Sequence, residues 1–349
     1  MKLLFVGGGT LGSVNPLLAC SRAIAQRRPD IQVKFWGRRV GLEKSVVQAA
    51  GMPYSWIPAG KYRQYFSLQN FLDICLVACA VVVAWFRLLL SRPAAVVTAG
   101  SYVAVPVAWA AASLGIPVVL YQQDMQVGLA NRLIAKVAKL RTAALPEQAA
   151  QVPGGAKAIG FVLRADLQAG KASQAAQTYG LDAHQPTVVV VGGSSGARDL
   201  NAAFLSALPL LPSSLQVLHI TGEQKAAHVN RPGYVAISFT NENLPDVYAL
   251  ATMVITRAGM NVLAELVALQ KPAIIVPLPG THQEQNAKTL AQRGAVVLQQ
   301  AECTPEKFAG LISRICADAD YRTQLSTALA GSWSTAGAST LAEKILSLV

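Results

Sequence analysis

Acidic side chains are scarce in the first half of this sequence. Residues 1–165 contain five Asp and Glu against 18 Lys and Arg, whereas residues 166–349 contain 13 against 12. So uneven a charge excludes a general solubility bias and indicates an anionic partner for the first half alone. Histidine is also missing before residue 165, which excludes from that half the side chain most often used as a general base.

Cysteines and long apolar runs are few. Five cysteines, an odd number, fit neither a disulfide framework nor a zinc spacing, and this indicates a reducing compartment. The apolar run after Lys2 is too short for a signal peptide. In the most apolar segment, 71–90, thirteen uncharged residues separate Asp73 from Arg87, fewer than the ~20 needed to cross a bilayer. That segment predicts a helix, either at a membrane interface or buried in the core, and both readings stay open.

Strand-like and helical segments alternate along the whole chain. Apolar runs such as MKLLFV, AAVVTAG and TVVVVGG each precede a loop and a helical stretch. This alternation predicts an α/β protein with two Rossmann-like, doubly wound parallel-sheet domains facing a cleft. A new first strand near residue 187, after a segment with glycine and proline, places the first domain at 1–160, the second at 161–331 and a final helix in 332–349.

Several loops that follow strands suit phosphate or sugar groups. The stretch FVGGGTLGSVNP carries glycines in a G-x-G-x-x-G pattern, and GGSSGAR places Ser194 before a second helix. A third loop joins Arg257 and Gly259 to a helix in which Glu265 lies two turns on, where a carboxylate can accept both hydroxyls of a ribose. Such loops at the carboxyl ends of parallel strands are where open α/β sheets bind ligands.

The first glycine loop also fits an NADP-dependent oxidoreductase. Strand two ends in WGRR, so Arg38 or Arg39 could pair with a 2′-phosphate. That interpretation gives no role to the loops of the second half.

Six motifs resemble the MurG family of two-domain, B-type glycosyltransferases. They are GGTLGSVNP, GSYVAVP, YQQDMQVGLANRLIAK, GGSSGARDLN, RAGMNVLAEL and HQEQNA, spread over nearly the whole chain. The resemblance implies transfer of N-acetylglucosamine from UDP-GlcNAc to undecaprenyl-diphospho-N-acetylmuramoyl-pentapeptide (lipid I), giving lipid II for the cell wall. It also implies a peripheral protein on the cytoplasmic face of an anionic membrane, with a polyprenyl-diphosphate acceptor at the first half, a UDP-sugar donor at the second, and neither cofactor nor nucleic acid as a partner. The final helix would cross back to the first domain.

Site residues follow from the loops and the resemblance together. The donor candidates are Arg164, Ser194, Phe239, Thr240, Arg257, Gly259, Glu265, Gln283 and Asn286. The acceptor candidates are Gly9, Thr10, Gly12, Tyr102 and Asn131. The resemblance places Ser194 and Arg164 by the diphosphate, Glu265 on the ribose, Gln283 and Asn286 on the sugar, and Phe239 with Thr240 beside the uracil.

The catalytic base departs from the family pattern. Leu11 and Ser13 stand where the family has glycine and histidine, and YQQD replaces its H-E-Q-N segment. Asp124 is the first-half carboxylate that follows a strand in a family motif, so we expect it to be the base, oriented by Ser13. The alternative is that Asp124 caps the next helix and the base is lost. The triplet at 318–320 resembles a metal-binding D-x-D but reads as a surface turn, so we expect no metal.

These departures leave two further hypotheses open. One keeps the UDP-sugar donor but changes the lipid acceptor, because the changed motifs lie on the acceptor side. The other is a non-catalytic protein that binds nucleotide sugars, because the histidine is absent.

Overall fold

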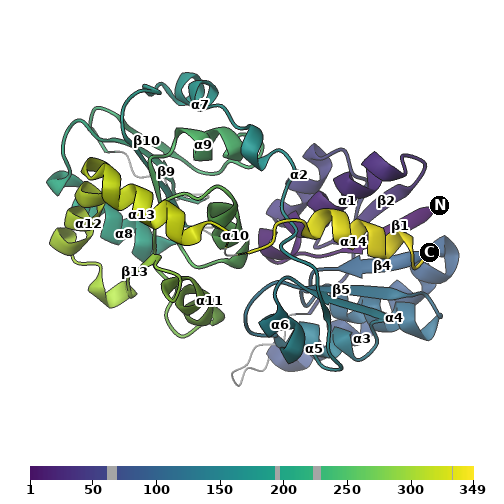
Figure 1. Cartoon of the computed structure of the whole chain (residues 1–349). Coiled ribbons are helices and arrows are strands. Elements are labelled where there is room, and N and C mark those ends of the chain that lie inside the picture. Colours follow the sequence, from purple (N-terminus) through teal and green to yellow (C-terminus); the bar gives the residue numbers. More distant parts are fainter. Residues whose placement is uncertain (61–68, 193–196, 223–228, 332) are drawn as a thin grey trace. The chain divides into compact units, whose positions relative to one another are not determined.

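The computed structural model describes residues 1–60, 69–192, 197–222, 229–331 and 333–349, with the backbone alone for 69–74. Within them the chain forms two compact units. Unit 1 is Met1–Arg164 with Ser334–Val349, and unit 2 is Ala165–Trp333. Figure 1 shows both, coloured along the sequence.

Unit 1 is built around a parallel sheet in which all described pairings are parallel, in the order β3-β2-β1-β4-β5-β6-β7. Its strands are β1 Lys2–Val6, β2 Gln32–Gly37, β3 Tyr54–Trp56, β4 Ala95–Thr98, β5 Val118–Gln122, β6 Leu140–Ala143 and β7 Lys157–Ala158. Its helices are α1 Asn15–Arg27, α2 Leu42–Ala49, α3 Gln69–Ser91, α4 Ala104–Ser113, α5 Leu129–Ala135, α6 Pro146–Gln151 and α14 Gly337–Leu346. The apolar face of α3, α4 and α5 packs on one side of this sheet.

Unit 2 repeats the plan with a sheet in the order β10-β9-β8-β11-β12-β13, parallel throughout the part of the chain described. Its strands are β8 Thr187–Val191, β9 Gln216–Ile220, β10 Tyr234–Ile237, β11 Met253–Thr256, β12 Ala273–Ile275 and β13 Val296–Val297. Its helices are α7 Ala172–Tyr179, α8 Arg198–Ala207, α9 Leu244–Leu250, α10 Met260–Ala268, α11 His282–Ala291, α12 Pro305–Ala317 and α13 Ala319–Leu329. The predicted α/β class with two parallel sheets is confirmed.

The end of the chain belongs to unit 1. The Phe161 N–H donates to the Ser334 carbonyl at 2.7 Å, and the Gly337 N–H donates to the Phe161 carbonyl at 3.1 Å. A side chain at Gly337 would collide with the backbone of Gly160 and Phe161, so only glycine permits this close approach. Helix α14 then packs against α1, as the yellow and purple helices of Figure 1 show.

Helix α3 has two different faces. Ala80, Ala84 and Leu88 are buried against the rest of unit 1, whereas Phe86 and Leu90 are 58% and 87% exposed. The reading of this segment as a fully buried core helix is therefore wrong. Among the helices that the structure describes, none combines the length and apolar character required to cross a membrane.

Candidate functional site

In unit 1 the predicted acceptor residues gather at the carboxyl edge of the sheet, because they follow parallel strands. The loop after β1 carries Gly9, which has a φ of +89° that favours glycine. An added Cβ at Gly9 would lie 3.2 Å from the Tyr102 ring in the loop after β4. Thr10 and Gly12 are exposed in the same β1 loop. These two loops therefore form one surface.

Ser13 closes the β1 loop on itself. Its hydroxyl accepts from the Gly8 N–H at 3.1 Å and donates towards the carbonyls of Gly8 and Thr10 at 3.2 and 3.3 Å. The Gly8 carbonyl also accepts from the hydroxyl of Ser101, a non-glycine residue at φ 103°, at 2.7 Å. The hydrogen bonds of Ser13 within the described chain all stay in its own loop. It shapes the loop, and it gives no direct orientation to Asp124.

An ion pair between a half-buried arginine and a buried carboxylate supports this edge. Arg38, just after β2, makes a two-pronged contact with Glu43, Nε to Oε1 at 2.6 Å and Nη2 to Oε2 at 2.9 Å. Burial would raise the pKa of the Glu43 carboxyl, but hydrogen bonds from Arg38 and the backbone outweigh it, so the pKa is lowered. Glu43 also accepts from the Gly9 N–H at 3.4 Å, and Arg38 interacts with Tyr102. Arg38 is thus neutralised, and its predicted pairing with a 2′-phosphate is contradicted.

Asp124 lies two residues beyond β5, half-buried, in a segment held by amide side chains. Asn131 on α5 donates to the Gln122 side chain at 2.6 Å, and Gln122 in turn donates to the Asp124 carbonyl at 2.7 Å. The cap of α5 is Gly128, without a side-chain hydrogen bond, so Asp124 does not cap this helix as the alternative supposed. The structure therefore connects Asn131 and Asp124 through Gln122, which sequence reasoning had not assigned a role.

In unit 2, α11 is tied to the loop after β11. The Gln283 side-chain oxygen accepts from the N–H groups of Ala258 and Leu278 at 3.2 and 3.1 Å. The buried Asn286 donates to the Ala258 carbonyl at 3.0 Å. Fixing the Gln283 oxygen directs its NH₂ group away from these partners, and within the described residues that group has no acceptor. Gln283 is thereby oriented to donate to a ligand, whereas Asn286 holds the loop.

Arg257 is 5% exposed at the end of β11. Its Nη1 donates to the carbonyls of Val276 and Pro277 at 3.2 and 3.3 Å. Burial lowers its pKa, while the negative charge of Asp199 acts in the opposite direction. In the part of the chain that the structure describes, Arg257 makes no ion pair at salt-bridge distance, so its charge is uncompensated by direct contact.

Glu265 is buried in α10, which begins after Gly259. Its Oε2 accepts from the Tyr248 hydroxyl of α9 at 2.8 Å. This hydrogen bond sets the orientation of the carboxylate. Sequence reasoning missed Tyr248, because the two residues lie on different helices and meet only through the tertiary fold.

A second buried network was also missed. The His219 ring on β9 contacts the Tyr234 hydroxyl at 2.9 Å through Nδ1 and the Asn201 side-chain oxygen at 3.2 Å through Nε2. Asn201 on α8 also donates to the Thr221 carbonyl at 2.9 Å. Burial lowers the pKa of His219 to about 4, so the ring is neutral at physiological pH. The network braces α8, the helix that follows the second glycine-rich loop.

The remaining candidates are placed as follows. Phe239 and Thr240 are half-buried just after β10, and α9 separates them from β11. Arg164 is the last residue of unit 1 before the chain enters unit 2. Ser194 lies outside the described residues. Asp318 caps α13 by accepting from the Tyr321 N–H at 2.9 Å, and the next two residues begin that helix, so the triplet at 318–320 is a helix start and not the expected surface turn.

Two parallel sheets covered by helices, with polar loops at their carboxyl edges, define the two-domain, Rossmann-like class of α/β proteins. The fold agrees: a solved structure of Acinetobacter baumannii MurG superposes with a TM-score of 0.70 at 24% identity, over 99% of each chain.

The sequence comparisons identify the family within that class. The glycosyltransferase family 28 N-terminal domain matches residues 3–141, and its C-terminal domain matches residues 187–345. Proteins described as UDP-N-acetylglucosamine–N-acetylmuramyl-(pentapeptide) pyrophosphoryl-undecaprenol N-acetylglucosamine transferase are similar. The protein from Lachnospira eligens is 32% identical over 91% of each chain. That from Symbiobacterium thermophilum is 32% identical over 100% of this chain and 96% of its own. The chain belongs to glycosyltransferase family 28, and the predicted family is confirmed.

Proposed function

We propose that this enzyme transfers N-acetylglucosamine from UDP-GlcNAc to lipid I, giving lipid II and UDP. Unit 2 binds the donor and unit 1 the acceptor. The observation that carries the proposal is the set of polar side chains at the carboxyl edge of the unit 2 sheet, which suits a nucleotide-sugar donor. There a buried arginine with no carboxylate partner among the described residues, an oriented glutamine amide and an oriented carboxylate follow one set of parallel strands. The activity named for the similar proteins supplies the substrates.

On the donor, each of these groups has a separate task. The Arg257 guanidinium stabilises the charge of the diphosphate, which grows as UDP leaves. The Glu265 carboxylate, oriented by Tyr248, accepts hydrogen bonds from the ribose hydroxyls. Gln283 donates its oriented amide hydrogens to the sugar. Arg164, Ser194, Gly259, Phe239 and Thr240 complete the proposed donor set, and Asn286 supports the loop.

The reaction is an inverting displacement. A hydroxyl of the acceptor attacks the anomeric carbon of the sugar from the side opposite UDP. A carbon–oxygen bond forms there, while the bond from that carbon to the diphosphate oxygen breaks and its electron pair leaves with UDP. The hydroxyl proton passes to the Asp124 carboxylate, whose segment is held by Gln122 and Gln148. This chemistry uses no metal in our proposal.

The acceptor is held in the membrane, so unit 1 must reach it. Helix α3 presents an exposed apolar face in the unit that carries the basic excess. A helix of this kind lies in the interface with its apolar side among the lipids, and basic residues are attracted to an anionic leaflet. We therefore place unit 1 on the cytoplasmic face of the membrane as a peripheral domain.

Calorimetric titration of the purified chain tests the donor half first. We expect saturable binding of UDP-GlcNAc, weaker binding of UDP-glucose and none of NADPH. E265Q should weaken UDP-GlcNAc binding about tenfold, because a neutral amide accepts ribose hydrogen bonds less strongly. The exposed Glu284→Gln on α11 is the matched control. Equal loss in both variants would contradict the role of Glu265.

Turnover with lipid I in detergent then tests the acceptor. Formation of lipid II and UDP supports the proposal. Binding of UDP-GlcNAc, with UDP released from it only in the presence of other lipid acceptors, would assign the enzyme to a different glycolipid. Binding without turnover on any acceptor would mean a non-catalytic protein.

A further inference from the structure

Ser101 has an unusual backbone conformation. Its φ is 103°, and among the residues that the structure describes only two other non-glycine residues, Arg92 and Gln270, have a positive φ. Those two lie close after helices α3 and α10, at φ of 35° and 52°, where a left-handed residue commonly ends a helix. Ser101 instead lies between β4 and α4, with a φ well beyond that region. Strained residues of this kind persist where the surrounding structure holds them, and they cluster at functional sites.

Contacts on both sides of Ser101 hold this strained turn. The preceding residue, Gly100, also has a positive φ, 99°, and its N–H donates to the hydroxyl of the buried Thr98 at 3.0 Å. A side chain at Gly100 would collide with Asn131 of α5. On the other side, the Val103 N–H donates to the Ser101 hydroxyl at 3.2 Å. Because the hydroxyl oxygen accepts this hydrogen bond, its proton can be donated to a partner outside the turn.

The Ser101 hydroxyl reaches the β1 loop. It donates to the Gly8 carbonyl at 2.7 Å, although 93 residues separate the two in the sequence. The same carbonyl accepts from the Ser13 hydroxyl at 3.2 Å, and that hydroxyl accepts from the Gly8 N–H at 3.1 Å. Ser13 therefore closes the β1 loop on itself, whereas Ser101 joins it to the loop after β4, which we call the β4 loop.

This hydrogen bond lies beside the acceptor candidates of unit 1. Gly9 follows Gly8, Tyr102 follows Ser101, and an added Cβ at Gly9 would lie 3.2 Å from the Tyr102 ring. The β1 and β4 loops are thus in contact next to the Ser101 hydrogen bond. Thr10 is exposed on the first of these loops and Tyr102 is half-buried on the second. The Ser101 hydrogen bond therefore sets how these two side chains lie relative to each other.

We infer that Ser101 is a positioning residue for the lipid acceptor, because its hydroxyl fixes the β1 loop against the β4 loop and makes Thr10 and Tyr102 one preorganised surface. This inference rests on the proposed function and adds a residue to its acceptor side. A glycine would adopt the same φ without strain, but it has no hydroxyl to donate. A serine at this position is therefore explained by the hydrogen bond to Gly8. A loop that is already fixed loses less conformational freedom when a ligand binds, and this strengthens binding.

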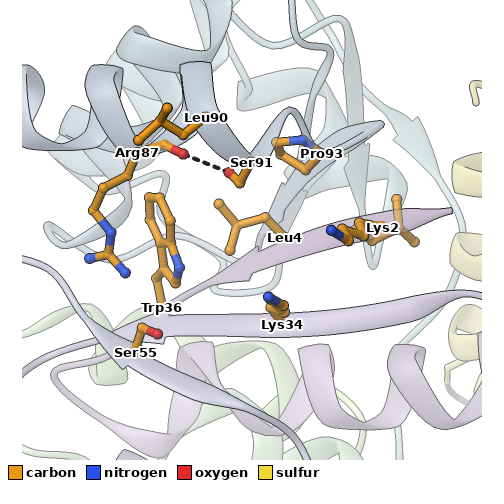
Figure 2. A pocket seen from close by; sticks show the side chains of 10 residues that line it. Lys2, Leu4, Lys34, Trp36, Ser55, Arg87, Leu90, Ser91 and Pro93 are labelled. Carbon is orange, nitrogen blue, oxygen red and sulfur yellow. Dashed lines mark hydrogen bonds between the residues drawn. The ribbon is translucent and has the colours of Figure 1, made fainter.

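Two variants of the full chain separate the hydroxyl from the strain. S101A removes the hydroxyl and keeps the strain, whereas S101G removes both. The matched control is S91A. The Ser91 hydroxyl donates to the Arg87 carbonyl, also at 2.7 Å, and Figure 2 shows this hydrogen bond as a dashed line at the end of α3. That hydrogen bond lies within one helix and joins no loops, so its loss should leave both substrates unaffected.

Steady-state kinetics with a short-chain, water-soluble lipid I analogue measure the effect on each substrate. S101A and S101G should both raise the KM of the acceptor about fivefold, the effect of one lost hydrogen bond, and should leave kcat and the KM of UDP-GlcNAc within about twofold of the parent values. In urea, S101G should unfold at a higher concentration than S101A, because it relieves the strain. An acceptor KM in S101G equal to that of the parent chain would show that strain and not the hydroxyl matters, and would overturn the inference. An equal rise in both KM values would show a general loss of structure and would overturn it as well.

Amide hydrogen exchange separates this inference from the proposed function, because it requires no substrate. Residues 7–13 should exchange about fivefold faster in S101A and S101G than in S91A and the parent chain, since a local hydrogen bond has been lost. Faster exchange in these variants, without turnover by the parent chain, would reject the lipid acceptor and keep Ser101 as the residue that fixes the β1 loop. Unchanged exchange would overturn the role of Ser101 and leave the proposed function standing wherever the parent chain turns over lipid I.

Discussion

Two arginines, one in each unit, follow a strand at the carboxyl edge of a parallel sheet, but their surroundings differ: the Arg38 side chain is 32% exposed, whereas Arg257 is 5% exposed. Arg38 in unit 1 forms a two-pronged ion pair with Glu43. Arg257 in unit 2 donates to two carbonyl oxygens and has no ion pair within the described chain. Carbonyl dipoles hold a guanidinium in position without cancelling its charge, whereas a carboxylate cancels it.

The difference separates a structural arginine from one prepared for a ligand. The Arg38–Glu43 pair also contacts Gly9 and Tyr102, so it supports the loops on which the acceptor would lie. Arg257 retains a charge that an incoming diphosphate can neutralise. The following variants test this contrast, from the largest expected effect to the smallest.

R257Q should lower turnover about 10²–10³-fold, because it removes a preorganised charge that stabilises the leaving diphosphate. Steady-state assays with UDP-GlcNAc and lipid I measure the loss. The matched control is R231Q. Arg231 also donates to two carbonyl oxygens, those of Leu211 and Pro212 in unit 2. If R231Q and R257Q lose the same activity, Arg257 has only a structural role.

D124N should lower kcat about 10²-fold, because an amide cannot accept the acceptor's proton. Binding of UDP-GlcNAc should stay unchanged, since Asp124 belongs to unit 1. E147Q, which alters an exposed carboxylate of the same unit, is the control. Turnover of D124N near that of the parent enzyme would remove Asp124 from the mechanism.

Unit 2 should lose stability in mild acid through His219. Its pKa is about 4 in the fold and about 6.5 in the unfolded chain, so the unfolded state binds the proton first as the pH falls. Stability is complete above pH 6.5 and declines below it, by about 2 kcal/mol at pH 5.

Urea unfolding at pH 7.5 and pH 5 measures this decline for His219. In H219Q the part of this decline that His219 causes should be absent. H184Q, which changes an exposed histidine, should decline as much as the parent chain does. An unchanged pH dependence in H219Q would show that the ring does not titrate in this way.

E43Q should lower the free energy of unfolding by about 1–2 kcal/mol. The buried carboxylate disappears, and Arg38 keeps a charge that water reaches only in part. Urea unfolding measures the loss, and titration with UDP-GlcNAc should show unchanged donor affinity. The control is D30N, which breaks the exposed pair with Arg28. A loss of donor affinity in E43Q would contradict the division of roles between the two arginines.

Much of the fold could be predicted because parallel strands are buried on both faces. Thr187–Val191 is buried throughout and consists of four valines after Thr187, so its sequence alone indicates a central strand. Once the strands are predicted, the position of the loops is predicted as well, because glycines and polar residues after such strands lie at the carboxyl edge of the sheet. Gln283 and Arg257 could be placed there for the same reason.

The partners of these residues could not be predicted. Tyr248 lies on a different helix from Glu265, and Tyr234 meets His219 across neighbouring strands. Sequence spacing carries no signal for such pairs. For Arg38 the sequence suggested a partner that the structure does not support. Its position after a strand suggested a phosphate ligand, but its guanidinium binds the carboxylate of Glu43, five residues later.

The return of the chain to unit 1 also governs how the protein is made. Unit 2 is complete once residue 333 has been synthesised, whereas unit 1 lacks α14 until residues 337–346 have left the ribosome. Until then the surface of α1 that packs against α14 has no cover. The half of the molecule that is translated first is thus the half that finishes folding last, and a nascent chain stalled before its final helix would expose an apolar surface to chaperones.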